Sequence, residues 1–110
     1  MNAICQIPGN LTAAAFASIS RAAGRARIPV FAFQTSQAHE GAAVVLARDY
    51  FEAGRLTAAM AVRIMRGENP AKMPFQSVSR SKLMVNLPAA NNAGLPLPDE
   101  VVKKAEQVIR

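Results

Sequence analysis

Three turns that follow apolar stretches of the chain contain the side chains best suited to bind a small molecule. Their candidate ligand-binding residues are Gly9, Asn10, Leu11, Gln34, Thr35, Ser36, Asp49 and Tyr50. Amide and hydroxyl groups donate and accept hydrogen bonds, carboxylates accept them, and an aromatic ring can stack on a planar ligand. These residue types predict reversible binding of a polar small molecule.

The first turn supports two interpretations that the sequence leaves open. Gly9 would let the backbone approach a ligand closely, and the N–H groups at the start of the next helix would suit a carboxylate. Alternatively, this is a plain tight turn in which Asn10 is the N-cap of that helix. Thr12 is a weaker candidate for a hydroxyl near the same turn.

The second and third turns differ in how strongly they predict ligand contacts. Gln34 follows a predicted strand end, where ligands bind in parallel α/β sheets, so a ligand contact is the better interpretation. Asp49 is interpreted first as a helix N-cap and second as a ligand contact. Tyr50 is expected to pack in the core rather than to stack on a ligand.

Residues suited to catalysis or metal binding are sparse. His39 lies beside Glu40, but no nucleophile accompanies them, so an exposed loop histidine is the simpler interpretation. Cys5 is the only cysteine, which excludes an intrachain disulfide, and its apolar neighbours predict a buried side chain. We predict no enzyme activity, no cofactor and no metal.

The composition is that of one small domain with a basic surface. Of the 110 residues, 51% are hydrophobic and 5% aromatic, and the net charge is +6. The basic residues are scattered rather than clustered, which favours a solvated surface over nucleic-acid binding. We therefore expect no nucleic-acid partner. No apolar run is long enough to cross a bilayer, so we also expect no membrane insertion.

An alternation of apolar and alanine-rich segments positions the turns and predicts an α/β fold. Residues 3–7, 29–33 and 42–47 are predicted strands, and residues 11–26 and 49–66 are predicted helices packed on the sheet. A strand, a crossover helix and a second strand pair in parallel by strong default. The turns would therefore share one edge of a parallel sheet with flanking helices.

Periodicity predicts which side of the second helix faces inward. The expected inward residues are Tyr50, Ala53, Thr57, Met60, Ile64 and Met65. Farther along, residues 75–78 and 83–85 are predicted short strands, and Asn86 is a predicted N-cap. A last helix is predicted to begin at Asp99.

Short motifs occur in a fixed order along nearly the whole chain. They are Ala3-Ile4, Pro8-Gly9-Asn10, Ile28-Pro29-Val30-Phe31, Gly41-Ala42, Arg48-Asp49-Tyr50-Phe51, Gly54-Arg55, Gly67-Glu68-Asn69-Pro70-Ala71, Val85-Asn86-Leu87, Ala90, Gly94-Leu95, Pro98 and Ala105-Glu106. In this order the chain resembles the C-terminal part of bacterial ABC-transporter substrate-binding proteins with the type I periplasmic binding fold. It is most similar to the branch that includes binders of aromatic and related amino acids.

The resemblance implies part of a two-lobed binding protein. Residues 1–74 would belong to the C-terminal ligand-binding lobe, and residues 75–110 would form a hinge return and a tail that packs on a missing N-terminal lobe. The intact protein would capture an amino acid or similar small molecule by lobe closure, deliver it to an ABC permease, and be periplasmic. No signal peptide is recognisable in this chain, which would be truncated and unable to bind alone.

The chain departs from the family pattern in the first two turns. Many members carry Asp in each, where this chain has Gly9 before Asn10 and has Gln34, so we expect a ligand that is neutral or anionic at that end. Two other classes remain as alternatives. A ligand-sensing domain of a transcription regulator with this fold would need an upstream helix-turn-helix, and a small α/β enzyme fragment would need a nucleophile and a base in the turns.

Overall fold

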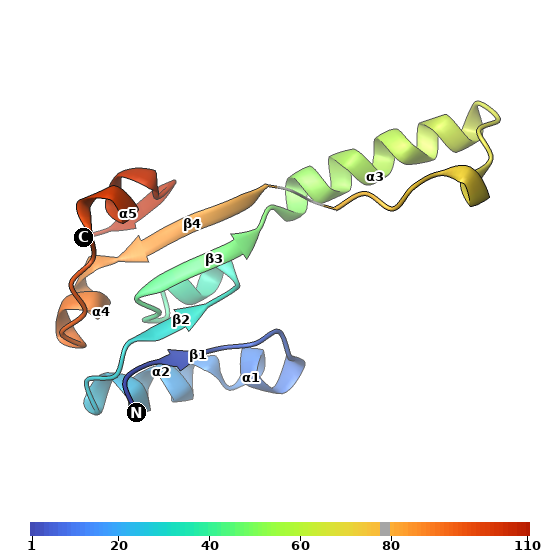
Figure 1. Cartoon of the computed structure of the whole chain (residues 1–110). Helices are drawn as coiled ribbons and strands as arrows, with labels where there is room; N and C mark the ends of the chain where they lie inside the picture. The colour runs from blue at the N-terminus through green and yellow to red at the C-terminus, as the bar shows by residue number, and fades with distance from the viewer. Residues whose placement is uncertain (78–79) are drawn as a thin grey trace. The chain divides into compact units, whose positions relative to one another are not determined.

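Apolar, β-branched runs form the strands and alanine-rich runs form the helices of the computed structural model, which describes residues 1–77 and 80–110 (Figure 1). In chain order the elements are β1 (Ile4–Cys5), α1 (Asn10–Ala14), α2 (Phe16–Arg25), β2 (Val30–Ala32), η1 (Thr35–Ala38), β3 (Val44–Arg48), α3 (Tyr50–Met65), η2 (Pro70–Lys72), β4 (Ser81–Asn86), α4 (Leu87–Asn92), α5 (Asp99–Lys104) and β5 (Gln107–Ile109). The predicted α/β class is confirmed.

The strands form one five-stranded sheet in the order β1-β2-β3-β4-β5. The first three strands are parallel, as predicted, with Ile4 opposite Val30 and Ala32 opposite Val45. The fourth strand, which lies beside β3, adds an antiparallel pair to the three parallel strands that were predicted. The Asn86 N–H donates to the Ala43 carbonyl oxygen at 2.9 Å, in the antiparallel direction, and β5 then runs parallel to β4. The sheet is therefore mixed, and mostly parallel.

The first predicted helix is two helices. Ala15 separates α1 from α2, with φ −89° and ψ 3°, so the helical hydrogen-bond pattern is interrupted there. The predicted N-cap role of Asn10 is wrong. Gly9 occupies the N-cap position with an extended backbone and no side-chain cap, and Asn10 is the first residue of α1. The sequence shows which residue types favour an N-cap. The residue at which the backbone becomes helical determines which one occupies the N-cap position.

One face of the sheet carries the apolar core. Phe16 and Ala23 of α2 are buried against Val30 of β2 and Val45 of β3, in a cluster that also includes Ala32, Ala38, Ala42, Ala47 and Met84. Because most of these side chains are small, helix and sheet lie close together. Cys5 is exposed, contrary to the prediction, because alternation along β1 directs Ile4 toward the core and Cys5 to the opposite face.

Asn86, at the end of β4, connects β4 to the segment that follows β2. Its Oδ1 accepts the Ala89 N–H at 2.9 Å, which confirms the predicted N-cap of α4. Its Nδ2 donates to the Ala38 carbonyl oxygen at 2.8 Å, a buried contact at the end of η1. A second contact, 3.4 Å between Gln107 Nε2 and His39 Nε2, joins β5 to the residue after η1. These contacts fix η1 against the sheet.

The second predicted helix has the expected extent but not the expected environment. Asp49 caps α3 as predicted, and the helix ends at Met65. No residue of α3 is buried, so the prediction that one stripe of this helix is buried is wrong. The packing of this helix on the sheet stays a prediction. Tyr50 is 71% exposed and Met65 85%. Periodicity shows which side chains share a helix face, but it does not show that the same chain covers that face.

The remaining predictions have mixed outcomes. Residues 75–77 of the predicted strand 75–78 have no regular structure, and residue 78 lies outside the described residues. The predicted strand 83–85 lies within β4, and the predicted last helix is α5, beginning at Asp99. The sequence did not predict β5.

The chain divides into two compact units. Unit 1 contains residues 1–47 and 82–110, and unit 2 contains residues 48–81. Every member of the apolar core cluster belongs to unit 1. The division at residue 74 that the resemblance implies stays a prediction.

Gly41 provides a sharp test of the packing in unit 1. Its φ is +103°, and an added Cβ would overlap Ser20 Oγ on α2. Gly94 has φ +65° but no atom within 4 Å of such a Cβ. We expect Gly41→Ala to lower the free energy of unfolding by about 1–3 kcal/mol, because it adds steric overlap to backbone strain. Gly94→Ala is the control, because it adds backbone strain without steric overlap. Equal losses for the two variants in urea unfolding would show that α2 does not pack against Gly41.

Candidate functional site

The first and second turns open at the same edge of the sheet because β1 and β2 are parallel and in register. The backbone pairing continues past β1, where the Gln6 N–H donates to the Phe31 carbonyl oxygen at 2.9 Å. The chain leaves this edge at Gly9 and again at Gln34, and both turns belong to unit 1. In open α/β sheets this edge is where ligands bind.

The first turn presents side chains rather than a helix N-terminus. Asn10 is exposed and Leu11 is 83% exposed, whereas Thr12 Oγ1 is engaged by the turn itself, donating to the Gly9 carbonyl oxygen at 3.0 Å. Gly9 has an extended backbone that any residue can adopt. Because α1 has five residues, its dipole is small, so the anion site considered from the sequence has little support.

The second turn is held by a buried glutamine that the sequence analysis did not single out. The Gln34 backbone N–H donates to Gln37 Oε1 at 3.0 Å, and Gln37 is 1% exposed. Gln34 is half-buried, and the hydroxyl-bearing residues Thr35 and Ser36 are exposed. The turn therefore presents an amide and two hydroxyls from a fixed backbone.

Two buried amide side chains near this edge have unsatisfied atoms. Gln6 Nε2, Gln6 Oε1 and Gln37 Nε2 are buried and have no hydrogen-bond partner among the described residues. Buried polar groups are normally paired, so both side chains are further candidates for contact with water or ligand. Their positions, directly after β1 and just after β2, were the available signal in the sequence.

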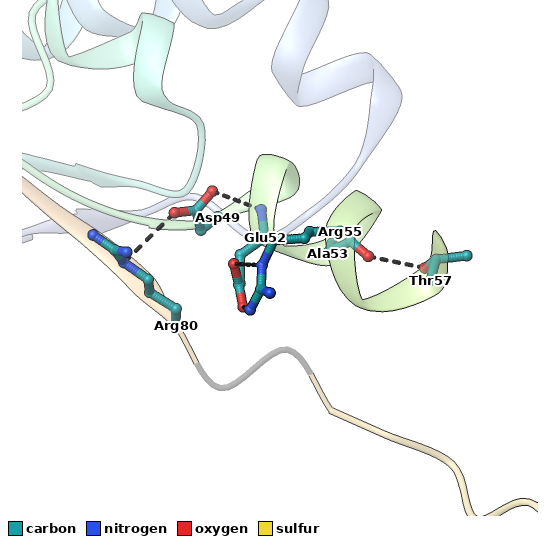
Figure 2. A network of polar contacts seen from close by, with 6 residues as sticks. All are labelled: Asp49, Glu52, Ala53, Arg55, Thr57 and Arg80. Carbon is teal, nitrogen blue, oxygen red and sulfur yellow. Dashed lines mark hydrogen bonds and ion pairs between the residues drawn. The ribbon is translucent and has the colours of Figure 1, made fainter. Parts of the chain in front are cut away.

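The third turn belongs to unit 2 and uses its carboxylate internally, as Figure 2 shows. Asp49 Oδ1 accepts the Glu52 N–H at 3.1 Å, and Asp49 Oδ2 lies 3.6 Å from Arg80 Nε. The Asp49 N–H also donates to the Arg80 carbonyl oxygen at 3.2 Å. Asp49 is buried, and the predicted cap is confirmed. Tyr50 is exposed, so the predicted core packing is wrong and its ring faces solvent.

A surface ion pair follows the cap on α3. Arg55 Nε and Nη2 donate to the Glu52 carboxylate at 2.9 and 2.6 Å (Figure 2). This hydrogen bonding lowers the pKa of Glu52 below its ordinary value of 4.5. Both side chains are on the helix surface, so the pair orders the first turns of α3 and has no catalytic geometry.

The described residues hold no group of three or more His, Cys, Asp or Glu side chains placed to bind a metal ion. Within residues 1–77 and 80–110, no helix is both long and apolar enough to span a membrane. What the arrangement can do chemically is form hydrogen bonds to a polar ligand through amides and hydroxyls.

Comparison with known proteins identifies a family. A family model described as ABC transporter substrate binding protein matches residues 1–109, nearly the whole chain. No curated protein matches the chain.

Solved structures agree with the family match. A conserved domain protein from Vibrio cholerae is 31% identical with a TM-score of 0.82, over 97% of this chain and 36% of that one. An ABC domain in complex with L-Trp from Streptococcus pneumoniae is 27% identical with a TM-score of 0.80, over 99% and 38%. A ligand-free, open substrate-binding protein with adhesive properties from Clostridium difficile is 27% identical with a TM-score of 0.70, over 91% and 33%. The chain thus spans about a third of the length of these structures.

The Asp49 cap can be separated from its ion pair by substitution. We expect Asp49→Ala to destabilise α3 by about 1 kcal/mol, because an N-cap acceptor is lost. Asn also accepts at an N-cap, so Asp49→Asn should retain most of the stability, and Arg80→Ala should cost less because Arg80 is 61% exposed. Amide exchange of residues 50–54 measures the difference. An effect of Arg80→Ala as large as that of Asp49→Ala would assign the stabilisation to the ion pair instead.

The Glu52–Arg55 pair predicts a pH dependence of α3. Because the pKa of Glu52 is lowered in the folded chain, chiefly by the Arg55 hydrogen bonds, its contribution is present above the unfolded pKa and is lost as pH falls through the folded pKa. NMR titration should give Glu52 a pKa below 4.5. In Arg55→Ala this pKa should move back toward 4.5. A Glu52 pKa that is the same in both proteins would show that the pair is absent in solution.

Proposed function

Because the chain belongs to the ABC-transporter substrate-binding protein family, we propose that it supplies part of the ligand-binding surface of the solute-binding component of an ABC importer. The ligand is an amino acid or a similar small molecule, captured by closure of two lobes and delivered to an ABC permease. The intact protein works in the periplasm. It binds and releases its ligand unchanged.

The observation that carries this proposal is the shared edge of β1 and β2. There, Asn10 and Leu11 of the first turn and Gln34, Thr35 and Ser36 of the second lie in one unit, at the position that binds ligands in α/β sheets. Gly9 contributes a backbone position at the same turn. The family match over residues 1–109 supports a binding role for this edge.

The side chains at this edge favour a particular end of the ligand. The first two turns contain amides and hydroxyls but no carboxylate. We propose that they hydrogen-bond the carboxylate or another neutral or anionic end of the ligand. Tyr50, exposed at the start of α3, would stack on a planar side chain, and Asp49 would contribute through the position of that helix. The L-Trp bound to the Streptococcus pneumoniae protein is a ligand of this type.

A two-lobe hybrid allows the proposal to be tested. In it, this chain replaces the 38% of the Streptococcus pneumoniae protein to which it corresponds. Isothermal titration with L-tryptophan, and then with the other proteinogenic amino acids, should give measurable affinity for at least one. The 110-residue chain alone should give none, because it spans only about a third of the length of the solved relatives. A folded hybrid that binds no amino acid would contradict the proposed ligand class.

Gln34 is the decisive position. We expect Gln34→Ala in the hybrid to weaken binding by about tenfold, because the loss of one buried hydrogen bond costs roughly 1–3 kcal/mol. Asn10→Ala should also weaken binding. Lys103→Ala, in the exposed last turn of α5, should not, and it is the control. Equal affinities for Gln34→Ala and the parent would remove the second turn from the site.

A further inference from the structure

The second turn is held by one buried side chain. Gln37 Oε1 accepts the Gln34 backbone N–H at 3.0 Å, and the Gln37 N–H donates to the Gln34 carbonyl oxygen at 3.0 Å. Gln37 is 1% exposed, whereas Gln34 is half-buried and Thr35 and Ser36 are exposed. Gln37 therefore fixes the backbone that carries the side chains of the second turn.

The same side chain also carries an unfavourable group. Gln37 Nε2 is buried and has no hydrogen-bond partner among the described residues. The penalty for an unpaired buried donor is at least as large as the net gain from one neutral hydrogen bond. Because an apolar side chain of the same length would avoid this penalty, the stability of the fold does not account for a glutamine at this position.

Buried side-chain nitrogen and oxygen atoms without a partner occur only at this edge of the sheet, among the residues that the structure describes. They are Gln6 Nε2, Gln6 Oε1 and Gln37 Nε2, directly after β1 and just after β2. Unpaired buried groups call for an explanation, and functional sites are where proteins retain groups that do not favour stability. The location thus indicates binding, rather than folding, as the role of Gln37.

The rest of η1 does not depend on the Gln37 side chain. The Ala38 carbonyl oxygen accepts Asn86 Nδ2 at 2.8 Å, and the Ala42 N–H donates to the Gln37 carbonyl oxygen at 3.0 Å. On the side of η1, both contacts use backbone atoms that any residue at position 37 would leave in place. Replacing the Gln37 side chain would therefore free the Gln34 N–H without detaching the segment from the sheet.

We propose that Gln37 is a positioning residue of the ligand site, which acts on the ligand through Gln34. The inference rests on the proposed function, because that function assigns Gln34 to the ligand. Without the Gln37 acceptor, the Gln34 N–H would bond to water and the start of the turn would sample more conformations. Ordering the turn would then oppose binding, so Gln37 raises affinity by pre-organising Gln34.

Gln37→Met in the two-lobe hybrid tests the proposal, because methionine is close to glutamine in length and shape but has no amide. Hydrogen exchange of the Gln34 N–H should become about tenfold faster. The affinity for L-tryptophan, or for the proteinogenic amino acid that the parent hybrid binds most tightly, should fall about threefold to tenfold. The free energy of unfolding in urea should equal or exceed that of the parent, because the unpaired donor is removed.

Gln107→Met is the matched control. It makes the same change at an exposed glutamine of β5, whose side chain contacts His39 after η1 rather than the second turn. It should alter neither the exchange of the Gln34 N–H nor the affinity. Equal effects of Gln107→Met and Gln37→Met would show that any loosening of η1 weakens the site, and would overturn the proposal.

A double-mutant cycle separates positioning from an independent effect of Gln37. If Gln37 acts through Gln34, then Gln37→Met should weaken binding little further in the Gln34→Ala hybrid. The double variant should therefore bind about as tightly as Gln34→Ala alone. A double variant whose loss of affinity is the product of the two single losses would show that Gln37 acts independently of Gln34.

Two further outcomes would contradict the role of Gln37. Unchanged exchange of the Gln34 N–H in Gln37→Met would show that the Gln37 side chain does not hold the turn. A fall in affinity matched by an equal loss of unfolding free energy would make Gln37 a structural residue. Exchange and unfolding need no ligand, so a hybrid that binds no amino acid would contradict the proposed ligand class, while faster exchange at unchanged stability would still support the hold of Gln37 on the turn.

Discussion

Parallel pairing of the first three strands is the constraint on which the rest of unit 1 depends. Parallel neighbours cannot be joined by a tight hairpin, so the chain must cross the sheet between β1 and β2 and again between β2 and β3. The first crossing is α1 and α2, and the second is η1, which Asn86 fixes through its bond to the Ala38 carbonyl oxygen. As a consequence, the chain leaves the sheet twice at one edge, with Asn10 after β1 and Gln34 after β2.

The same constraint accounts for where apolar surface is buried. The crossings supply Phe16 and Ala38 to one face of the sheet, and small residues on β2 and β3 let them approach closely. Every member of that core cluster belongs to unit 1, and no residue of α3, in unit 2, is buried. The chain spans about a third of the length of the solved structures that it resembles.

Residue types within a few positions predicted the helices and most strands well. Burial and strand direction, which depend on residues distant in the sequence, were predicted less well. The first three strands, the caps at Asp49 and Asn86, and the extent of α3 follow from residue types within a few positions. The exposure of Tyr50 and the antiparallel direction of β4 depend on which surfaces the rest of the chain covers. The break at Ala15 and the outward direction of Cys5 were not predicted. The three candidate ligand-binding turns could be located in the sequence because each follows the end of a predicted strand. Gln6 and Gln37 also follow strands, but only the structure shows that their amide atoms are buried without a hydrogen-bond partner among the described residues.

The central claim is that the edge shared by β1 and β2 contacts the ligand. A crystal structure of the two-lobe hybrid grown with the amino acid that it binds most tightly measures this directly. The account predicts polar ligand atoms within about 3 Å of the side-chain amides of Asn10 and Gln34, the distance of an ordinary hydrogen bond. A well-ordered ligand in the hybrid with neither residue within reach would contradict the account.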